Sequence, residues 1–396
     1  MTSNAPAPRG QLPRLLYVGD VPVESSYHGS ALIYRLLQNY PPERLRIVEG
    51  NLRRSLPGRR LAAVAYDSVR VGWRRPLYTR FNSWARLAYS LTACRKAGAV
   101  ERALAGFRPQ CVLTVAHDFL WLTAARYAER ESLPVHLICH DDWPRLARVP
   151  GPARPWLESG FGRVYRQAVS RLCVSPYMAA EYERRYAAAG TVLYPSRAAD
   201  APSFDAPPER LGKSVARLTI AFAGTVNSTA YLRSLGTLGR CLEGIGGRLL
   251  LFGPLAEADA VRAGLDRRNI EVRGMVSSDE LIRRVRAEVD ALFIPMSFAP
   301  EERECSALSF PSKLADYTAA GLPLLIFGPP YCSAARWAGE NPGVAEVVTQ
   351  ESPGALGAAL ERLSRPGLRA ALGEAALRLG NGFFSHAAAE RFFFRG

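Results

Sequence analysis

Lys313 and Asp316 stand three residues apart in a segment with the features of a short helix, and together they could bind a nucleotide. Pro311 can open a helix without losing a needed N–H group, and Gly321 can end it. Side chains at this spacing share one helix face. Lys313 would lie beside the free N–H groups of the first turn, where a diphosphate would bind, with Ser312 as a cap or donor. Asp316 could accept hydrogen bonds from ribose hydroxyls, although a capped helix with a solvated Lys–Asp pair is the alternative.

Glycine turns follow several of the predicted strands in the same half of the chain. Glycine lets the backbone approach a phosphate or a sugar closely, but each turn alone is a weak signal. A cluster of acidic residues comes next, in a predicted loop. The strand-end candidates are Gly224 with Thr225, Gly253, Gly274 with Met275 and Val276, and Ser297, and the acidic residues are Glu301, Glu302 and Glu304.

Alternating apolar strands and amphipathic helices must position these residues. The order predicts an α/β protein with two doubly wound, Rossmann-like domains that face each other across a cleft. One series runs from a strand at 14–18 to a strand at 191–193, with helical spacing over 82–105 and 119–131, and the other runs from 218–222 to 345–348. We expect a first domain at 1–195, a linker at 196–215, a second domain at 216–375, and a tail at 376–396 that returns to the first domain. Ligands of such sheets bind at the carboxyl ends of the strands.

Three of the five histidines stand near predicted strand ends in the first half, at His28, His117 and His140. Gly29 follows the first of them. Each histidine has a purely structural reading, but their common edge predicts a polar site. Asp141 and its neighbour Asp142 would point apart at a strand end, so we expect no metal site.

Charge is concentrated in the first half of the chain. The net charge is +15, of which residues 1–195 carry +14. The densest segment, 53–86, has nine arginines against one acid, interleaved with the aromatic residues Trp73, Tyr78, Phe81 and Trp84. This composition favours contact with an anionic membrane surface over nucleic acid, and a solvated basic face is the other reading.

The seven cysteines are scattered and contain no C-x-x-C pair. We therefore expect reduced thiols in a cytoplasm and no zinc. No apolar run of 18 residues is present. The expectation is a cytoplasmic protein that works at the inner face of the membrane.

The order of the strand-end segments, with Pro311-Ser312-Lys313 and Gly321-Leu322-Pro323 at its end, resembles the donor domain of family-4-like retaining glycosyltransferases with the GT-B fold. By this resemblance Asp316 stands where the family has a ribose-binding Glu. Ser312 and Lys313 would lie at the diphosphate, and Gly274, Met275 and Val276 would hold the base. The resemblance covers most of 15–380.

The resemblance implies metal-independent transfer of a hexose, without a cofactor, from a nucleotide diphosphate sugar to a glycan or lipid-linked acceptor. His140, Lys313 and Glu304 would be catalytic. Two positions depart from the family pattern: Leu308 replaces a Glu, and Gly224 is not followed by the usual Arg and Lys. A nucleic-acid-binding or nucleic-acid-modifying protein and a non-catalytic nucleotide-sugar-binding relative are the alternatives.

Overall fold

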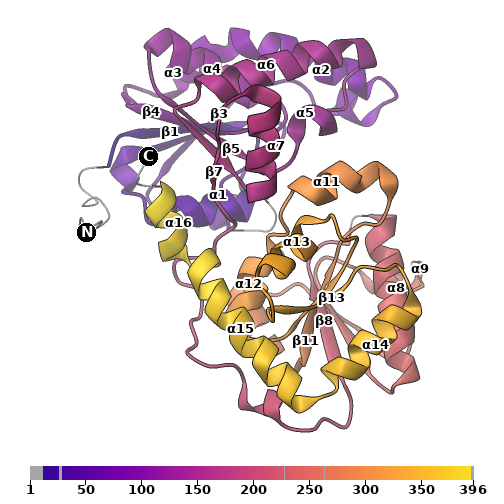
Figure 1. The fold of residues 1–396 in the computed structure, drawn as a ribbon. Coiled ribbons are helices and arrows are strands. Elements are labelled where there is room, and N and C mark those ends of the chain that lie inside the picture. The colour runs from indigo at the N-terminus through magenta and orange to yellow at the C-terminus, as the bar shows by residue number, and fades with distance from the viewer. Residues whose placement is uncertain (1–11, 26–28, 227, 263, 394–396) are drawn as a thin grey trace. The chain divides into compact units, whose positions relative to one another are not determined.

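The computed structural model describes residues 12–25, 29–226, 228–262 and 264–393. The chain forms two compact units, each with its own parallel sheet. Unit 1 comprises Met1–Tyr194 and Ala389–Gly396, and unit 2 comprises Pro195–Ala388. The predicted α/β class with two doubly wound domains is confirmed (Figure 1).

Unit 1 contains a seven-stranded parallel sheet of order β3-β2-β1-β4-β5-β6-β7. The strand order reverses between β1 and β4, which places a topological switch point at the carboxyl ends of these two strands. The strands are β1 (Leu15–Gly19), β2 (Leu45–Gly50), β3 (Ala65–Val69), β4 (Cys111–Val115), β5 (Val135–Cys139), β6 (Ser170–Cys173) and β7 (Thr191–Val192).

Helices cover both faces of this sheet. In Figure 1, α2, α3 and α4 lie over one face, and α1 and α16 lie on the other. Every residue of β1 is buried, as expected for a central parallel strand. The helices are α1 (Gly29–Leu37), α2 (Asn82–Ala93), α3 (Ala97–Ala103), α4 (Leu120–Glu131), α5 (Trp143–Leu146), α6 (Arg154–Gln167), α7 (Pro176–Tyr186) and α16 (His386–Phe393), with short 3₁₀ turns at Pro42–Arg44, Pro57–Arg59, Arg75–Tyr78, Cys94–Lys96 and Gly151–Ala153.

The end of the chain belongs to unit 1. Ala389 is buried in its apolar core beside strand residues such as Tyr17 and Ile47. The side-chain nitrogen of Asn39 also donates a hydrogen bond of 3.0 Å to Glu390 Oε1. These contacts hold the end of α16 against unit 1.

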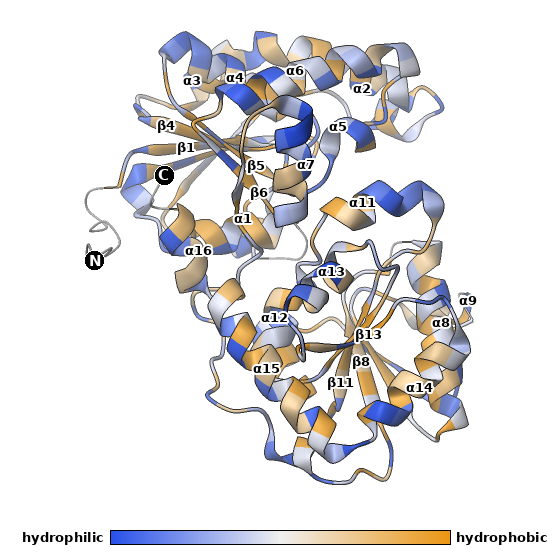
Figure 2. Cartoon of the chain, viewed as in Figure 1, coloured by the Kyte–Doolittle hydropathy of each residue, from blue (hydrophilic) through white to orange (hydrophobic). Residues whose placement is uncertain are grey.

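Unit 2 contains a six-stranded parallel sheet of order β10-β9-β8-β11-β12-β13. The apolar strands lie inside and the polar faces of the covering helices point outward (Figure 2). The strands are β8 (Thr219–Ala223), β9 (Arg248–Phe252), β10 (Ile270–Gly274), β11 (Ala291–Pro295), β12 (Leu324–Phe327) and β13 (Ala345–Val348). The helices are α8 (Thr229–Gly244), α9 (Glu257–Arg262), α10 (Ser278–Glu288), α11 (Arg303–Leu308), α12 (Lys313–Ala319), α13 (Ser333–Glu340), α14 (Pro353–Leu363) and α15 (Pro366–Phe384), with 3₁₀ turns at Glu209–Gly212 and Pro300–Glu302.

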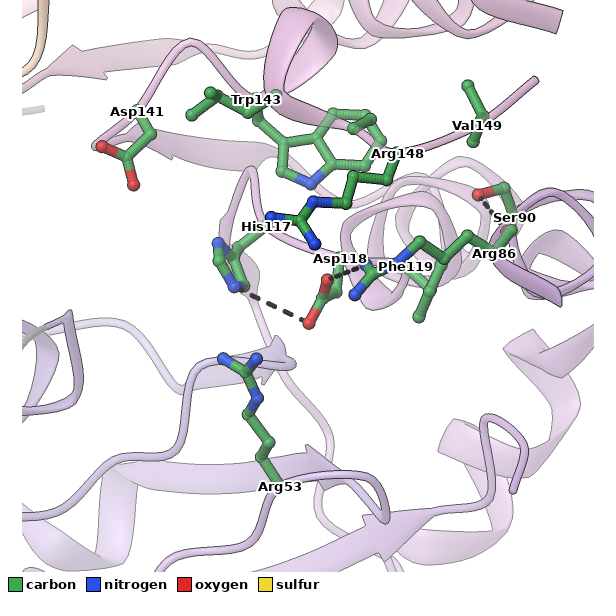
Figure 3. Close-up of a pocket in the computed structure, with 12 residues that line it drawn as sticks. Arg53, Arg86, Ser90, His117, Asp118, Phe119, Asp141, Trp143, Arg148 and Val149 are labelled. Carbon is green, nitrogen blue, oxygen red and sulfur yellow. Dashed lines mark hydrogen bonds and ion pairs between the residues drawn. The ribbon is translucent and has the colours of Figure 1, made fainter. Parts of the chain in front are cut away.

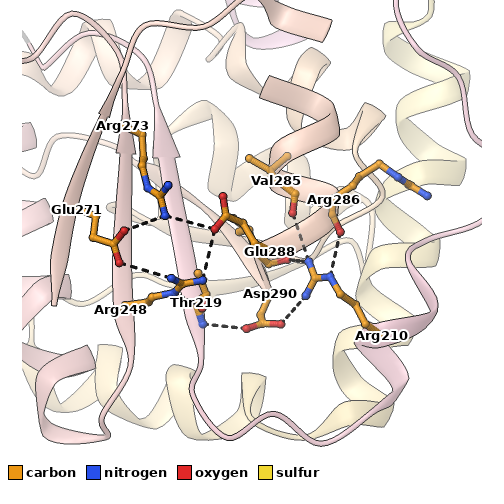
Figure 4. Close-up of polar contacts among 10 residues, drawn as sticks. Arg210, Thr219, Arg248, Glu271, Arg273, Val285, Arg286, Glu288 and Asp290 are labelled. Carbon is orange, nitrogen blue, oxygen red and sulfur yellow. Dashed lines mark hydrogen bonds and ion pairs between the residues drawn. The ribbon is translucent and has the colours of Figure 1, made fainter. Parts of the chain in front are cut away.

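The segment 196–215 packs against unit 2 along part of its length. Arg210 binds the Asp290 carboxylate at 2.8 Å and donates to the carbonyl of Arg286 at 2.9 Å (Figure 4). The other Asp290 oxygen accepts from the Thr219 N–H at 2.8 Å. Because Leu211 is also fully buried, this part of the segment is an ordered support for β8 and α10.

A second network in Figure 4 joins two neighbouring strands and α10. Arg248 on β9 reaches Glu271 on β10 at 3.5 Å and Glu288 on α10 at 3.4 Å. Arg273 contacts the same two carboxylates at 2.8 and 3.5 Å. The network holds the edge of the sheet that ends in Gly274. Within the described residues, no helix combines the length and the apolar character needed to cross a bilayer.

Candidate functional site

Three glycine turns meet at the carboxyl edge of the unit 2 sheet. Gly224, Gly253 and Gly274 have φ angles of +140°, +149° and +68°, which disfavour residues with a side chain. The Gly224 N–H donates to the Phe252 carbonyl at 2.8 Å, and the Gly253 N–H donates to the Gly274 carbonyl at 2.9 Å. A Cβ on Gly253 would overlap the Gly224 carbonyl. The three turns therefore form one continuous glycine surface that a ligand could approach closely.

The Lys313 side chain lies directly on this surface. A Cβ added to Gly224 would be 2.5 Å from Lys313 Cε and 3.0 Å from its Nζ. The ammonium group is 5.2 Å from the ring centroid of Phe222 and 5.7 Å from that of Tyr231. Burial lowers the pKa of Lys313 to about 8. Among the described residues, no carboxylate forms an ion pair with Lys313, so this buried cation has two aromatic rings for neighbours and no counter-ion.

Tyr317 fixes the position of α12 against β8. Its hydroxyl accepts from the Ala223 N–H at 2.6 Å and donates to the Ala223 carbonyl at 3.1 Å. Burial raises the pKa of Tyr317, so the phenol stays protonated. Because Tyr317 lies one turn along α12 from Lys313, these bonds hold Lys313 over Gly224. Neither Tyr317 nor the two rings beside Lys313 was among the predicted site residues, since only the tertiary structure brings them there.

The start of α12 is weaker than the sequence suggests. The helix has seven residues, and Ser312 stands at its N-cap position without a side-chain capping bond. Gly321 ends the segment as predicted, with a φ of +61°. A short helix contributes little dipole, so Lys313 is the main attraction for an anion here.

Asp316 has a charged neighbour within unit 2. Arg197 is buried, which lowers its pKa to about 10, and the Asp316 carboxylate opposes this shift. The Arg197 guanidinium also donates to the Ala315 carbonyl at 3.0 Å and to Thr318 Oγ1 at 3.1 Å. Arg197 therefore anchors α12 from outside the helix, and its charge acts on Asp316.

The other donor-side candidates surround the glycine turns at different depths. Thr225 lines a cavity of about 330 Å³ together with Val226, Pro254 and Leu255. Met275 is 47% exposed just beyond Gly274, and Val276 is partly buried. Ser297 is buried, and its Oγ accepts from the Ala299 N–H at 3.1 Å, which closes its own turn.

The acidic segment was predicted as a loop, and this prediction is wrong. Residues 300–308 form a 3₁₀ turn that runs directly into α11. Glu304 is exposed in the first turn of α11, and Leu308 is buried at its end. The helix forms because Pro300 opens the turn and acidic residues suit a helix start.

Unit 1 has its own polar pocket at the carboxyl ends of β4 and β5. The pocket has a volume of about 310 Å³ and is lined by His117, Asp118 and Asp141, among others (Figure 3). Asp118 lies 3.6 Å from His117 Nε2 and 3.1 Å from Arg86 Nη1. Its φ of +47° is unusual for a residue with a side chain. Strained backbone of this kind is concentrated at functional sites.

His140 lies at the end of β5 and is neutral. Burial lowers its pKa to about 4, the nearby Asp141 opposes that shift, and His117 adds to it. A Cβ on Gly29 would be 3.7 Å from His140 Nδ1, so the start of α1 passes close to the ring. Of the predicted acceptor-side residues, the structure brings Gly29 near His140, while His28 lies outside the described residues.

Asp20, at the end of β1, was not among the predicted site residues. Its Oδ2 accepts from the N–H groups of Phe119 at 2.7 Å and Leu120 at 2.6 Å. Burial, with a further effect of the Asp118 charge, raises its pKa to about 7. Asp20 thereby ties the start of α4 to β1. A carboxylate directly after Gly19, at the end of a buried strand, is the signal that could have found it.

The arginine-rich segment 53–86 divides into two parts. Arg53 and Arg86 line the pocket beside His117 and Asp118. Four of the five aromatic residues between them are exposed, with exposed fractions of 65% for Trp73, 77% for Tyr78, 55% for Phe81 and 63% for Trp84, whereas Tyr66 on β3 is partly buried. The segment therefore supplies a pocket wall as well as an exposed aromatic and basic surface.

The neighbouring carboxylates Asp141 and Asp142, which follow β5, have different surroundings. Asp142 is buried and paired with Arg185 at 2.8 Å, whereas Asp141 lines the pocket. No cluster of three or more His, Cys, Asp or Glu side chains suited to a metal ion occurs among the residues that the structure describes. The seven cysteines are free thiols.

Two doubly wound sheets of this order define the GT-B fold, which the chain shares with solved glycosyltransferases. HepE from Anabaena, solved with UDP and glucose, has a TM-score of 0.65 and 10% identity over 97% of this chain and 99% of its own. Sucrose-phosphate synthase from Thermosynechococcus elongatus has a TM-score of 0.65 and 13% identity over 96% and 97%.

A third similar structure is WaaG, a glycosyltransferase involved in lipopolysaccharide biosynthesis. It has a TM-score of 0.60 and 15% identity over 96% of this chain and 100% of its own. No protein-family model and no curated protein matches the sequence. At these identities the likeness shows the fold, as the sequence predicted.

Proposed function

We propose that the protein is a glycosyltransferase that moves a hexose from a nucleotide diphosphate sugar to a glycan or lipid-linked acceptor. The observation that supports this proposal most is Lys313, a largely but not fully buried cation that has no acidic partner among the described residues and lies on a glycine surface. Burying a charge is costly unless an opposite charge compensates it. A diphosphate would supply that charge. The fold supports the proposal, because HepE was solved with UDP-glucose.

Unit 2 would bind the donor. The diphosphate would lie against Lys313 and the backbone at Gly224, Asp316 would accept from the ribose, and the turn from Gly274 would hold the base. Negative charge grows on the diphosphate as its bond to the anomeric carbon breaks. Lys313 would stabilise that charge where it develops, which lowers the barrier to reaction.

Unit 1 would bind the acceptor and position it for transfer. The acceptor hydroxyl oxygen forms the new bond to the anomeric carbon, the bond to the diphosphate oxygen breaks, and the hydroxyl proton passes to the released nucleotide or to solvent. Neutral His140 can donate or accept a hydrogen bond, and we propose that it orients the reacting sugar or hydroxyl beside Gly29 and His117. Glu304 remains a further candidate at the donor sugar.

We also propose that the reaction retains the anomeric configuration and requires no metal ion. Retention follows from the resemblance of the strand-end segments to retaining enzymes. Lys313 offers the diphosphate a positive charge that a metal ion would otherwise supply. The anomeric configuration of the product, read by NMR, tests the first statement, and turnover in the presence of a chelator tests the second.

From the exposed aromatic and basic surface we propose that the protein binds the cytoplasmic face of an anionic membrane. Trp73, Tyr78, Phe81 and Trp84 lie among the exposed arginines Arg74, Arg75 and Arg80. Aromatic rings insert at the headgroup level, and arginines attract anionic lipids. A lipid-linked acceptor would be reached from such a position. Co-sedimentation with vesicles tests this, because equal binding to neutral and anionic vesicles at low salt would contradict it.

Calorimetric titration with UDP, GDP and their sugars tests the proposed function. The wild-type chain should bind one of these nucleotides, and Lys313→Ala should lose at least about 10-fold in affinity, the loss expected for one contact to a charged group. Lys213→Ala is the matched control, since Lys213 is exposed in the same unit. If none of these nucleotides binds, the proposal is overturned.

A further inference from the structure

The pocket of unit 1 contains more positive charge than its carboxylates can neutralise. Arg53, Arg86 and Arg148 come from three separate parts of the chain: the loop after β2, helix α2 and the loop after α5. Figure 3 shows their guanidinium groups directed toward the space beside His117 and Asp118. Such convergence is unusual for arginines that are simply solvated, since like charges repel each other.

Only one of these three arginines has a carboxylate partner in the pocket. Arg86 Nη1 lies 3.1 Å from Asp118 Oδ1. Arg53 and Arg148 are both exposed, and neither forms a hydrogen bond or an ion pair with another described residue, although the Arg53 charge acts on the Asp20 carboxylate. Asp118 also faces His117 at 3.6 Å, so both of its oxygens have neighbours. Two guanidinium groups are therefore left with their donors directed into one concave space.

We infer that this pocket binds a phosphate group carried by the acceptor, as a monoester or a diester. Guanidinium groups present paired N–H donors that match phosphate oxygens, and two of them can hold one phosphate from opposite sides. The His117 ring could contribute a further hydrogen bond. The volume of about 310 Å³ is in the range of small-molecule sites, which leaves room for part of the attached sugar.

The position of the pocket gives this group a role in the reaction. It lies at the carboxyl ends of β4 and β5, where His117 and Asp141 begin the loops beside His140. A phosphate bound by Arg53 and Arg148 would fix the acceptor relative to the His140 ring. The identification of the ligand as the acceptor rests on the proposed function, but the anion site itself does not.

The test measures anion binding to the full chain under conditions that distinguish the pocket of unit 1 from the proposed donor site of unit 2. Calorimetry at constant ionic strength uses inorganic phosphate and glucose 6-phosphate in a Lys313→Ala background, so that the donor site does not contribute. The double variant Arg53→Gln, Arg148→Gln should lose at least about 10-fold in affinity. The double variant Arg102→Gln, Arg163→Gln changes the net charge equally at exposed positions of unit 1 outside the pocket and outside the segment 53–86, and it should change affinity less than about twofold.

The phosphate group could belong to a soluble sugar phosphate or to a lipid headgroup, and a second assay distinguishes these two sources. Vesicles of phosphatidylcholine with phosphatidic acid replace the soluble phosphates in a co-sedimentation assay. If only the pocket variant loses affinity, for the soluble phosphates or for the vesicles, the inference is supported, and the probe that shows the loss identifies the source of the phosphate. Equal losses in the two double variants, or unchanged binding in the pocket variant, would overturn it. Wild-type UDP binding is measured separately, so failure of the pocket is distinguished from failure of the proposed function.

Discussion

Replacing Lys313 by methionine should stabilise the ligand-free protein and weaken its binding of a nucleotide diphosphate. The two effects have one cause, because the ammonium group is held in a buried place without a carboxylate partner among the described residues. Methionine keeps much of the length and apolar volume of the lysine stem over Gly224. It removes only the charge and its contacts with the two rings.

The expected gain follows from the pKa of Lys313. Burial lowers that pKa from the usual 10.5 to about 8. Each pKa unit corresponds to about 1.4 kcal/mol, so the charged form costs roughly 3 kcal/mol of unfolding free energy at neutral pH. Loss of the contacts with Phe222 and Tyr231 offsets about 1 kcal/mol of this. A net gain of roughly 2 kcal/mol should raise the melting temperature of unit 2 by about 4–8 °C.

The pH dependence of this gain has a defined sign. Between about pH 8 and pH 10.5 the unfolded chain keeps a proton on Lys313 that the folded chain has lost. The wild-type protein should therefore gain stability from this group as pH rises through that window, and the gain is absent below pH 8. Lys313→Met lacks this titration. Its advantage over the wild type should be largest at pH 7 and should disappear by about pH 10.

Calorimetric melting at pH 7 and pH 10, with and without UDP, measures both effects. The nucleotide should raise the wild-type melting temperature and have a much smaller effect on the variant, since one lost charge-assisted contact reduces affinity by about 10- to 100-fold. A variant that melts earlier than the wild type at pH 7 and binds UDP equally well would refute the reasoning. Lys313 would then be a structural side chain.

The remaining predictions concern neighbouring residues. His140→Ala should reduce turnover at least about 100-fold with nucleotide affinity within about twofold, and an equal loss in both would assign His140 to donor binding. Asp316→Ala should lower the affinity for UDP but not the affinity for pyrophosphate, whereas an equal loss of both affinities would contradict a ribose contact. Tyr317→Phe should cost about 1–3 kcal/mol of stability and weaken UDP binding, because the Ala223 N–H loses its partner; unchanged UDP affinity would refute its positioning role. Trp73→Ala with Trp84→Ala should lower binding to anionic vesicles, and no change would contradict the membrane surface.

The parts of the fold that the sequence predicts well are its buried strands. The central strands of both sheets are continuous apolar runs that end in glycine or a polar residue, and this pattern marks both the strand and the edge where ligands bind. β3 was not predicted, because it lies at the edge of its sheet with a mostly exposed face. The helical segment 82–105 is interrupted by a 3₁₀ turn at Cys94–Lys96, which its composition does not indicate.

The candidate site was predictable residue by residue but not in its contacts. Lys313 and Gly224 were each expected at the donor site, and the structure brings them together. The residues around Lys313 are Tyr231 on α8, Phe222 on β8 and Tyr317 one turn along α12, and no local pattern connects these three elements. The arginine-rich segment shows the same limit. Arg53 and Arg74 are both exposed, and composition cannot tell that only Arg53 of the two lines the pocket.

A crystal structure of the protein with bound UDP tests the central claim most directly. A phosphate oxygen should lie about 3 Å from Lys313 Nζ, within hydrogen-bond distance, with the diphosphate against the Gly224 turn and the ribose toward Asp316. A nucleotide bound elsewhere, with Lys313 still beside Phe222 and Tyr231 and no anion near it, would show that Lys313 does not bind the donor.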